Sequence, residues 1–262
     1  MKKQFLFGKL VRFLIFFALV SGYKQNLYAQ DITTYQYRHV APDKMAEFIK
    51  RETTYWSKVA KDAIAKGNLT FWGLFQKIGG SDDADSPNFL FINTFKNIDG
   101  NMGNIWNATK AFPGTPLAKM ETNSISTTTS TVFLSDDGWQ QSAKAVPDKD
   151  FNYVVMNYHN SSDPAGFVAL EKKYWGPFIK TTMDNNQVSQ VAWGNSIVLS
   201  PRGGNMKFNS VSADLFPTLK AALMPGWSSN VTFPTQGLDS LQKISLSPSD
   251  AVIYKIIKVE TK

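Results

Sequence analysis

Cysteine is absent from this chain of 262 residues. The absence excludes disulfide bonds, thiolate metal sites, a cysteine nucleophile and the lipidated cysteine of a bacterial lipoprotein. Stability must therefore come from packing alone. The chain has the material for a core, because 43% of its residues are hydrophobic and 13% are aromatic.

Long hydrophobic runs are also absent. The apolar stretch FLIFFALV at 13–20 is far shorter than the roughly 20 residues that a membrane-spanning helix needs. Basic residues precede this run, and LYAQ follows at 27–30, an order that is typical of a secretory signal peptide cleaved after Ala29. We expect residues 1–29 to be removed and the mature protein to be soluble, in the periplasm or outside the cell, without stable membrane insertion.

A strong positive charge is missing from the expected mature chain. The formal net charge of the whole sequence is +7, but five Lys or Arg and no Asp or Glu lie in residues 1–29, which leaves +2. A basic balance that resides in a signal peptide gives no reason to expect binding to nucleic acid or anionic membranes. We therefore expect neither as a partner.

Motifs of well-known catalytic sites are missing as well. The sequence has no HExxH zinc motif, no GxSxG nucleophile motif, and no glycine-rich phosphate loop after a strand. It has only two histidines. From these absences we expect the protein to bind no cofactor and no metal.

What the chain does contain is an internal repeat. ETTYW at 52–56 and EKKYW at 171–175 share the frame Glu-x-x-Tyr-Trp. Other matches keep the same order, and they pair HVAPDKMAEF (39–48) with HNSSDPAGF (159–167), FWG (71–73) with AWG (192–194), and FINTF (91–95) with KFNSV (207–211). This alignment makes His39 equivalent to His159, and Asn93 equivalent to Asn209. We interpret the pattern as a tandem duplication, with a first repeat at 30–146 and a second at 147–262.

Each repeat predicts the same six elements in the order β-α-β-β-α-β. The first has strands at 34–40, 69–78, 88–95 and near 131–135, a long helix that Gly67 closes, and a shorter helix near 98–112. The second has strands at 151–159, 188–199, 206–213 and near 251–258, a long helix that starts at Asp163-Pro164, and a shorter helix near 214–223.

This element order is that of a ferredoxin-like unit, an antiparallel sheet with both helices on one face. The other face of each sheet would be aromatic and costly to expose, which favours packing one sheet against the other. We therefore predict an α+β fold in which two ferredoxin-like units form an intrachain pseudo-dimeric α+β barrel. A monomer is expected rather than an obligate oligomer.

With Trp-Gly in the second strand of each unit and Glu-x-x-Tyr-Trp in its first helix, the chain resembles the dimeric α/β-barrel superfamily. That superfamily includes antibiotic-biosynthesis-monooxygenase-like and NIPSNAP-like proteins. More narrowly, the chain resembles uncharacterised exported proteins of Bacteroidetes. The superfamily contains cofactor-independent oxygenases, haem-degrading enzymes, haem peroxidases and isomerases, so the resemblance implies the fold and not one activity. No catalytic signature of a characterised member matches residue for residue.

Four residues are candidates for catalysis. His39 and His159, near the ends of equivalent strands, could shuttle protons, bind a metal or serve as an axial haem ligand. Alternatively, each could cap the following helix or bond the backbone nearby. Glu52 and Glu171 fall on the apolar stripe of their helices, where a desolvated carboxylate would have a raised pKa and could act as a general base. A structural role, in which each glutamate accepts a bond from the sheet, is the alternative. A His2Glu2 metal site across the pseudo-twofold axis has only the residue types in its favour.

Aromatic and amide side chains are candidates for ligand binding. These are Trp72, Trp193, Tyr55, Tyr174, Asn93 and Asn209. An apolar interior with one or two amides suits a small hydrophobic ligand, but it equally suits a packed core. The first hypothesis is therefore an exported small-molecule-binding protein. The second is a cofactor-independent monooxygenase or isomerase with Glu52 or Glu171 as the base, and the third is an interaction module without a pocket.

Overall fold

The computed structural model describes residues 31–262, apart from residues 81–85, 104 and 204–205. The predicted signal peptide lies outside the described residues. Residues Asp31–Lys262 form one compact unit. No helix among the described residues is long and apolar enough to cross a membrane.

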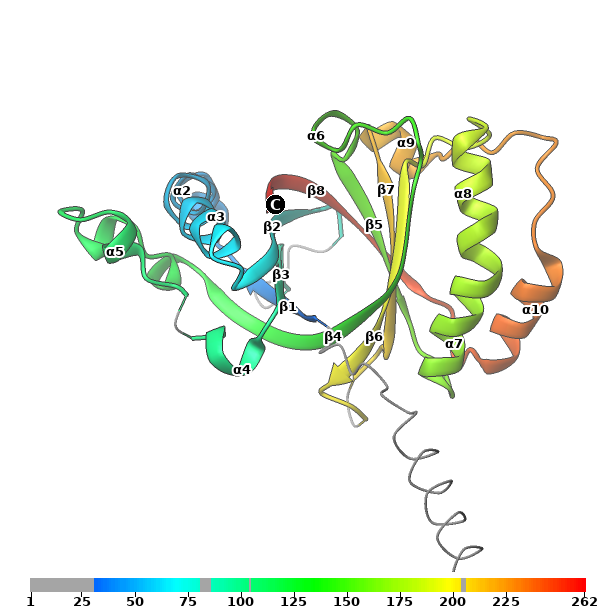
Figure 1. Cartoon of the computed structure of the whole chain (residues 1–262), viewed down its shortest axis with the longest axis horizontal. Coiled ribbons are helices and arrows are strands. Elements are labelled where there is room, and N and C mark those ends of the chain that lie inside the picture. The colour runs from blue at the N-terminus through cyan, green and yellow to red at the C-terminus, as the bar shows by residue number, and fades with distance from the viewer. Residues whose placement is uncertain (1–30, 81–85, 104, 204–205) are drawn as a thin grey trace, which may run out of the picture. The chain divides into compact units, whose positions relative to one another are not determined.

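Eight strands close into one antiparallel barrel in the order β1-β3-β2-β8-β5-β7-β6-β4 (Figure 1). The strands are β1 (Ile32–His39), β2 (Leu69–Ile78), β3 (Phe89–Phe95), β4 (Thr127–Gln141), β5 (Tyr153–His159), β6 (Ala192–Ser200), β7 (Ser210–Phe216) and β8 (Asp250–Thr261). The four strands of each half follow the same spatial order, β4-β1-β3-β2 and β8-β5-β7-β6. Two seams, β2 with β8 and β4 with β6, join the halves. The predicted pseudo-dimeric α+β barrel is thereby confirmed, whereas the boundary between residues 146 and 147 stays a prediction.

The interior of the barrel is filled by side chains. Because successive residues of a strand face opposite sides of the sheet, every second residue points inward, and all eight strands contribute to one buried cluster. Near its centre, the Tyr37 hydroxyl donates to the Tyr158 hydroxyl at 3.1 Å, and the Tyr158 and Tyr254 hydroxyls lie 3.3 Å apart. Of the two alternatives that the sequence left open, the barrel interior is the packed core.

One long helix lies against the outer face of each half-sheet. In the first half it consists of α2 (Met45–Arg51), the π-helical turn η2 (Glu52–Trp56) and α3 (Ser57–Ala65). In the second half it consists of α7 (Pro164–Leu170), the π-helical turn η5 (Glu171–Trp175) and α8 (Gly176–Asp184). Phe48, Ala60 and Ile64 of the first helix pack with Trp72 and Phe91 of the sheet in a second buried cluster.

Short helices fill the connections. They are η1 (Pro42–Lys44), α4 (Ile98–Asn101), α5 (Ala108–Ala111), η3 (Leu117–Lys119), η4 (Asn123–Ile125), α6 (Pro147–Asp150), α9 (Leu219–Leu223) and α10 (Thr235–Ile244). The single helix expected near 98–112 is therefore two one-turn helices, α4 and α5. The helix expected from 214 starts at Leu219, because β7 continues to Phe216.

Equivalent hydrogen bonds in the two halves correct the alignment of the repeats that the sequence suggested. The backbone N–H of Asn88 donates to the Arg38 carbonyl, and that of Asn209 donates to the His159 carbonyl. The side chains agree, since the Asn88 amide bonds both backbone groups of Val40 and the Asn209 amide bonds both backbone groups of Ser161. Asn209 is therefore equivalent to Asn88.

Two proposed equivalences were wrong as a result. His159 corresponds to Arg38 and not to His39. Asn93 lies beside Trp72 in the sheet, as Asp214 lies beside Trp193, so Asn93 corresponds to Asp214 and not to Asn209. An error of one residue matters in a strand because it moves a side chain to the opposite face of the sheet.

Candidate functional site

A cavity of about 250 Å³ lies between the turn η2 and the outer face of the first half-sheet. Its walls are all from the first half of the chain. They are Gln36, Arg38, Glu52, Trp56, Trp72, Phe91, Asn93, Trp106, Thr122 and Asn123. Four aromatic rings and six polar side chains surround this small space, a combination that could hold and orient a small organic molecule.

Strand alternation explains which sheet residues reach the cavity. On β1, Tyr35 and Tyr37 point into the barrel, so Gln36 and Arg38 point toward the helix. Phe91 is directly opposite Gln36 on the neighbouring strand β3. The sheet therefore presents its polar residues in a stripe under the helix.

The π-helical turn places the Glu52 side chain in the wall of the same cavity. The Ser57 N–H donates to the Glu52 carbonyl, five residues back, which inserts one residue into the helix. The equivalent bond runs from the Gly176 N–H to the Glu171 carbonyl. The repeated Glu-x-x-Tyr-Trp frame is thus the π-helical turn of each half. Such turns occur often at functional sites, where they redirect a side chain.

The Glu52 carboxylate is almost completely buried, with 4% of the residue exposed. The Thr122 hydroxyl donates to Glu52 Oε1 at 2.6 Å, and Arg38 Nη1 lies 4.0 Å from the same oxygen. Burial raises the pKa of Glu52 to about 7, although the Thr122 bond and the Arg38 charge both oppose the rise. Near neutral pH this group can therefore release or accept a proton.

Arg38 supplies the positive charge of the cavity wall. Its Nε donates to Gln36 Oε1 at 2.8 Å, and its Nη1 donates to the Thr122 hydroxyl at 3.3 Å. The guanidinium carbon lies 4.9 Å from the centre of the Phe91 ring, which is close enough for a cation–π contact. Burial lowers the pKa of Arg38 and Glu52 opposes this, but an arginine remains charged at any ordinary pH.

Asn93 provides a polar group without a partner. Its Nδ2 donates to the Thr34 hydroxyl at 3.4 Å, whereas its Oδ1 accepts no bond from any described residue. The residue is 9% exposed. A buried acceptor without a donor costs about 1–3 kcal/mol. A hydrogen-bond donor that reached this oxygen would remove that cost.

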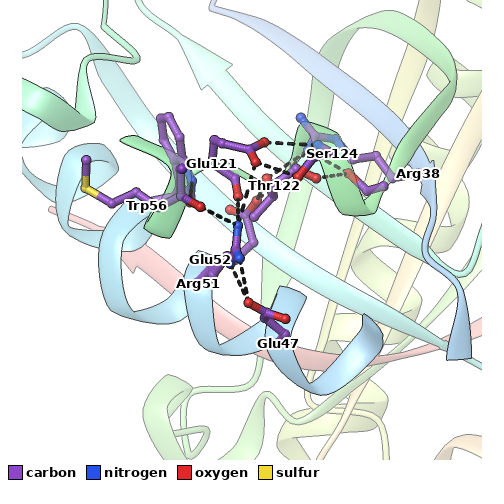
Figure 2. Close-up of polar contacts among 11 residues, drawn as sticks. Arg38, Glu47, Arg51, Glu52, Trp56, Glu121, Thr122 and Ser124 are labelled. Carbon is purple, nitrogen blue, oxygen red and sulfur yellow. Dashed lines mark hydrogen bonds and ion pairs between the residues drawn. The ribbon is translucent and has the colours of Figure 1, made fainter. Parts of the chain in front are cut away.

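A segment between α5 and β4, residues 117–126, closes one side of the cavity, and we call it the strap. Figure 2 shows how the helix holds it. Trp56 Nε1 donates to the Met120 carbonyl at 2.8 Å, and Arg51 Nη1 donates to the carbonyls of Ala118 and Glu121. Thr122, also in the strap, bonds Glu52 as described above. The strap and the π-helical turn therefore form one hydrogen-bonded wall.

The second half fills the equivalent space with polar side chains of its own. Asn195 Nδ2 donates to Glu171 Oε2 at 3.1 Å, and His159 Nε2 lies 3.8 Å from Glu171 Oε1. His159 Nε2 is also 2.9 Å from the Ser212 hydroxyl. Asp214, the equivalent of Asn93, accepts a bond from Gln190 at 2.7 Å. At the positions that line the cavity in the first half, the second half has side chains that are hydrogen-bonded to other protein groups.

Burial controls the titration of this network. It raises the pKa of Glu171 to about 8, with a smaller contribution from the Asp214 charge, and it raises the pKa of Asp214 to about 6. It lowers the pKa of His159 to about 4. Burial therefore shifts all three groups toward their neutral forms, although Asp214 is still mostly ionised at pH 7.

Other predicted site residues lie apart from the cavity lining. His39 Nδ1 is 2.8 Å from the Ser86 carbonyl. The ring of Tyr55 meets that of Phe112 edge-on at 5.1 Å, and Tyr174 packs against Gly237 of α10. Trp193 is 1% exposed in the core under the second helix. Of the residues proposed from the sequence, the cavity brings together Glu52, Trp72 and Asn93.

Arg38 and Thr122, the two residues that contact the Glu52 carboxylate, are among the site residues that the sequence did not reveal. Arg38 precedes His39 directly, and the alignment that was wrong by one residue drew attention to the histidine instead. Thr122 lies in a connection with no periodic pattern, so its approach to Glu52 depends on the tertiary fold. Among the described residues, no group of three or more His, Asp or Glu is arranged to hold a metal ion.

No family model matches the sequence, and no curated protein matches it. Several solved structures are similar. A candidate monooxygenase from Lactobacillus acidophilus has a TM-score of 0.57 and 14% identity, with 88% of this chain and 96% of that chain covered. A candidate monooxygenase from Fusobacterium nucleatum has a TM-score of 0.56 and 11% identity, with 90% and 96% covered. An anthrone oxidase-like protein has a TM-score of 0.53 and 10% identity, with 88% and 93% covered.

At these identities the likeness shows the fold alone, which is the dimeric α+β-barrel fold of monooxygenase-like proteins. The narrower resemblance to NIPSNAP-like proteins and to exported proteins of Bacteroidetes stays a prediction. Function has to be argued from the site.

Proposed function

We propose that this chain is an exported small-molecule-binding protein whose ligand occupies the cavity between η2 and the first half-sheet. The observation that supports the proposal is the cavity itself, with Trp56, Trp72, Phe91 and Trp106 around it and with Asn93, whose Oδ1 has no partner among the described residues, in its lining. Aromatic walls would bury a flat apolar body, and the polar groups would orient it. Export rests on the signal peptide and predicts a mature protein that begins at Gln30, which the intact mass would show.

The second half offers an internal comparison for this proposal. Its glutamate, histidine and aspartate are hydrogen-bonded to Asn195, Ser212 and Gln190, so these groups are paired within the protein. The equivalent spaces of the two halves therefore differ, because protein groups are hydrogen-bonded across one and a cavity lies in the other. That difference is what a binding site in only one of two copies would produce.

Binding is tested with a matched pair of tryptophan variants. Trp72 and Trp193 are equivalent and both 1% exposed, but only Trp72 is part of the cavity lining. We expect Trp72→Phe to lower the affinity for a bicyclic aromatic ligand at least about fivefold in calorimetric titration, since contacts worth about 1 kcal/mol are lost. Trp193→Phe should leave the affinity unchanged while costing similar stability. The proposal would be wrong if thermal shift found no stabiliser among aromatic, lipid and tetrapyrrole compounds, or if Trp193→Phe weakened binding equally.

One observation supports an enzymatic alternative, a cofactor-independent monooxygenase or isomerase. Glu52 has a pKa of about 7 on the cavity wall, beside the Arg38 cation. A base with such a pKa could take a proton from a carbon next to a carbonyl, while Arg38 stabilised the enolate oxygen. An isomerase would return the proton to another carbon of the substrate, and a monooxygenase would let dioxygen react with the carbanion.

Glu171, the other candidate base, is not part of the cavity lining. The enzymatic proposal therefore predicts that Glu52→Gln lowers turnover of a substrate at least about a hundredfold, within the range of general-base contributions. Glu171→Gln should leave turnover unchanged. Equal effects of the two substitutions would show that Glu52 is not the base.

A further inference from the structure

The positive charge of Arg38 is poorly matched within the cavity wall. Its Nε and Nη1 donate to Gln36, Thr122 and Ser126, which are all neutral acceptors. Its Nη2 has no acceptor among the described residues. Among the described residues, the carboxylate that approaches it is Glu52, 4.0 Å from Nη1, and burial raises the pKa of that group to about 7.

The other arginine beside this helix turn is already engaged. Arg51 pairs with Glu47 on its own helix and with Glu121 of the strap. A buried charge is stable only when it is paired or well hydrogen-bonded. The free edge of Arg38 therefore favours an anionic oxygen from outside the protein.

The second unmatched group lies at the far end of the same stripe. Asn93 is opposite Thr34 in the sheet, and Thr34 precedes Arg38 by four residues along β1. With about 3.4 Å per residue, the two groups are attached about 14 Å apart along the strand. Gln36 and Phe91 lie between them, also opposite one another.

We propose that the ligand is a small aromatic carboxylic acid that carries a hydroxyl or N–H donor at the end opposite its carboxylate. The carboxylate would meet the free edge of Arg38, the aromatic body would lie along Phe91 and the tryptophans, and the donor would bond Asn93 Oδ1. This proposal rests on the proposed binding function and specifies its ligand. A cavity of about 250 Å³ limits that ligand to roughly two fused rings.

The first experiment compares two ligands on the unaltered protein, so it does not depend on a variant that folds. The probes are 6-hydroxy-2-naphthoate and its neutral analogue 6-hydroxy-2-naphthamide, titrated by calorimetry at pH 6. We expect the carboxylate to bind at least about tenfold more tightly, because a charge-assisted bond is roughly twice as strong as a neutral one. As the pH rises through 7 and Glu52 ionises, this advantage should shrink.

Two variants then assign each end of the ligand. Arg38→Gln should reduce the advantage of the carboxylate over the amide to less than about twofold. Asn93→Leu should weaken 6-hydroxy-2-naphthoate about tenfold but leave 2-naphthoate, which lacks the hydroxyl, unchanged. A loss of both ligands by the same factor in either variant would indicate general damage and would contradict the assignment of that end.

The outcomes separate this inference from the function on which it rests. If the amide binds as tightly as the carboxylate, the anionic ligand class is wrong and the binding function stands. If 2-naphthoate binds as tightly as its hydroxylated analogue, the role of Asn93 is wrong. If the protein binds neither these probes nor any other aromatic compound, the binding function fails as well.

Discussion

Glu52 and Glu171 occupy the same position in their π-helical turns but have different neighbours. Glu52 bonds Thr122 of the strap and borders the cavity. Glu171 bonds Asn195, and it lies near His159. The carboxylates are similarly buried, so exposure alone does not distinguish them. The two glutamates differ in their hydrogen-bond partners: the sheet supplies a partner to Glu171, and the strap supplies one to Glu52.

The sheet residues explain this divergence. Asn195 is equivalent to Leu74, and Ser212 is equivalent to Phe91. In the second half these two polar residues bring hydrogen bonds to Glu171 and His159. In the first half apolar side chains stand at those positions. Glu52 therefore has its bonding partners only at the strap and at Arg38, and the space beside it stays open.

The buried glutamates predict how stability depends on pH. A carboxyl group whose pKa is raised by folding keeps its proton in the folded state when the unfolded chain has lost it. Folding stability then falls as pH rises, from about 4.5 up to the folded pKa, by about 1.4 kcal/mol per pH unit for each such group. Asp214 titrates mainly below about pH 6.5 in both states, and the unfolded form of His159, with a pKa near 6.5, adds only a small change of opposite sign above that point. Glu52 and Glu171 therefore dominate above pH 6.5.

Between pH 6.5 and 8 we therefore expect the unfolding free energy to fall by about 2 kcal/mol, mostly because of Glu171. Urea unfolding at pH 6.5, 7 and 8 measures this change. Glu171→Gln should nearly abolish the change between pH 7 and 8, since its amide cannot ionise. Glu47→Gln, which alters an exposed carboxylate of the first helix, serves as the control and should keep the slope. An unaltered slope in Glu171→Gln would show that this carboxyl group is already ionised at neutral pH.

The π-helical turn is the element that organises the site, and the sequence did not indicate it. Apolar spacing predicted one continuous helix in each half, and the helices were found where the pattern placed them. An inserted residue in a helix does not disturb its hydrophobic pattern enough to be recognised. The repeated Glu-x-x-Tyr-Trp frame could be identified, but its conformation could not, because the i to i+5 bond depends on how the helix packs on the sheet.

Strand β4 shows a similar limit. The sequence predicted a strand near 131–135, whereas β4 covers Thr127–Gln141. Its first part pairs with β1 of its own half and its last part pairs with β6 of the other half. The extension into DDGWQQ has little strand character of its own. This segment is a strand because it pairs with β6 of the other half, and that pairing depends on the tertiary fold.

The hydrogen bonds of the strap predict a local change in hydrogen exchange that a substitution in the first half should cause and the equivalent substitution in the second half should not. Trp56→Phe removes the indole N–H that bonds the Met120 carbonyl, while it keeps most of the ring contacts. One such bond contributes about 1 kcal/mol, so hydrogen exchange in residues 117–126 should become about fivefold faster. Mass spectrometry of peptides from the strap measures this rate.

Trp175 provides the matched control, because it occupies the same position of the second π-helical turn and contacts Phe178 and Trp227. Trp175→Phe should leave exchange in the strap unchanged. Unaltered exchange in Trp56→Phe would mean that the strap is held by its other bonds, those of Arg51 and Thr122.

At the scale of the whole molecule, the barrel joins two units that repeat one plan. Each half-sheet has one face on its helix and the other face in the shared interior. The seams β2 with β8 and β4 with β6 supply the remaining strand pairs. The inner face of either half-sheet would be exposed without its partner, which is why a duplication is an effective way to build this fold.

This arrangement predicts that the two halves unfold together. Ile64 of α3 and Ile179 of α8 are buried in separate clusters, one in each half. Either Ile→Ala substitution should cost about 2–5 kcal/mol. Because the interior is shared, each should lower the hydrogen-exchange protection of β1 and β3 and of β5 and β7 by the same free energy, in subdenaturing urea. Fluorescence and circular dichroism should then give coincident transitions. Loss of protection only in the half that carries the substitution would mean that the units are stable separately, and that the seams join two folded sheets instead of completing one.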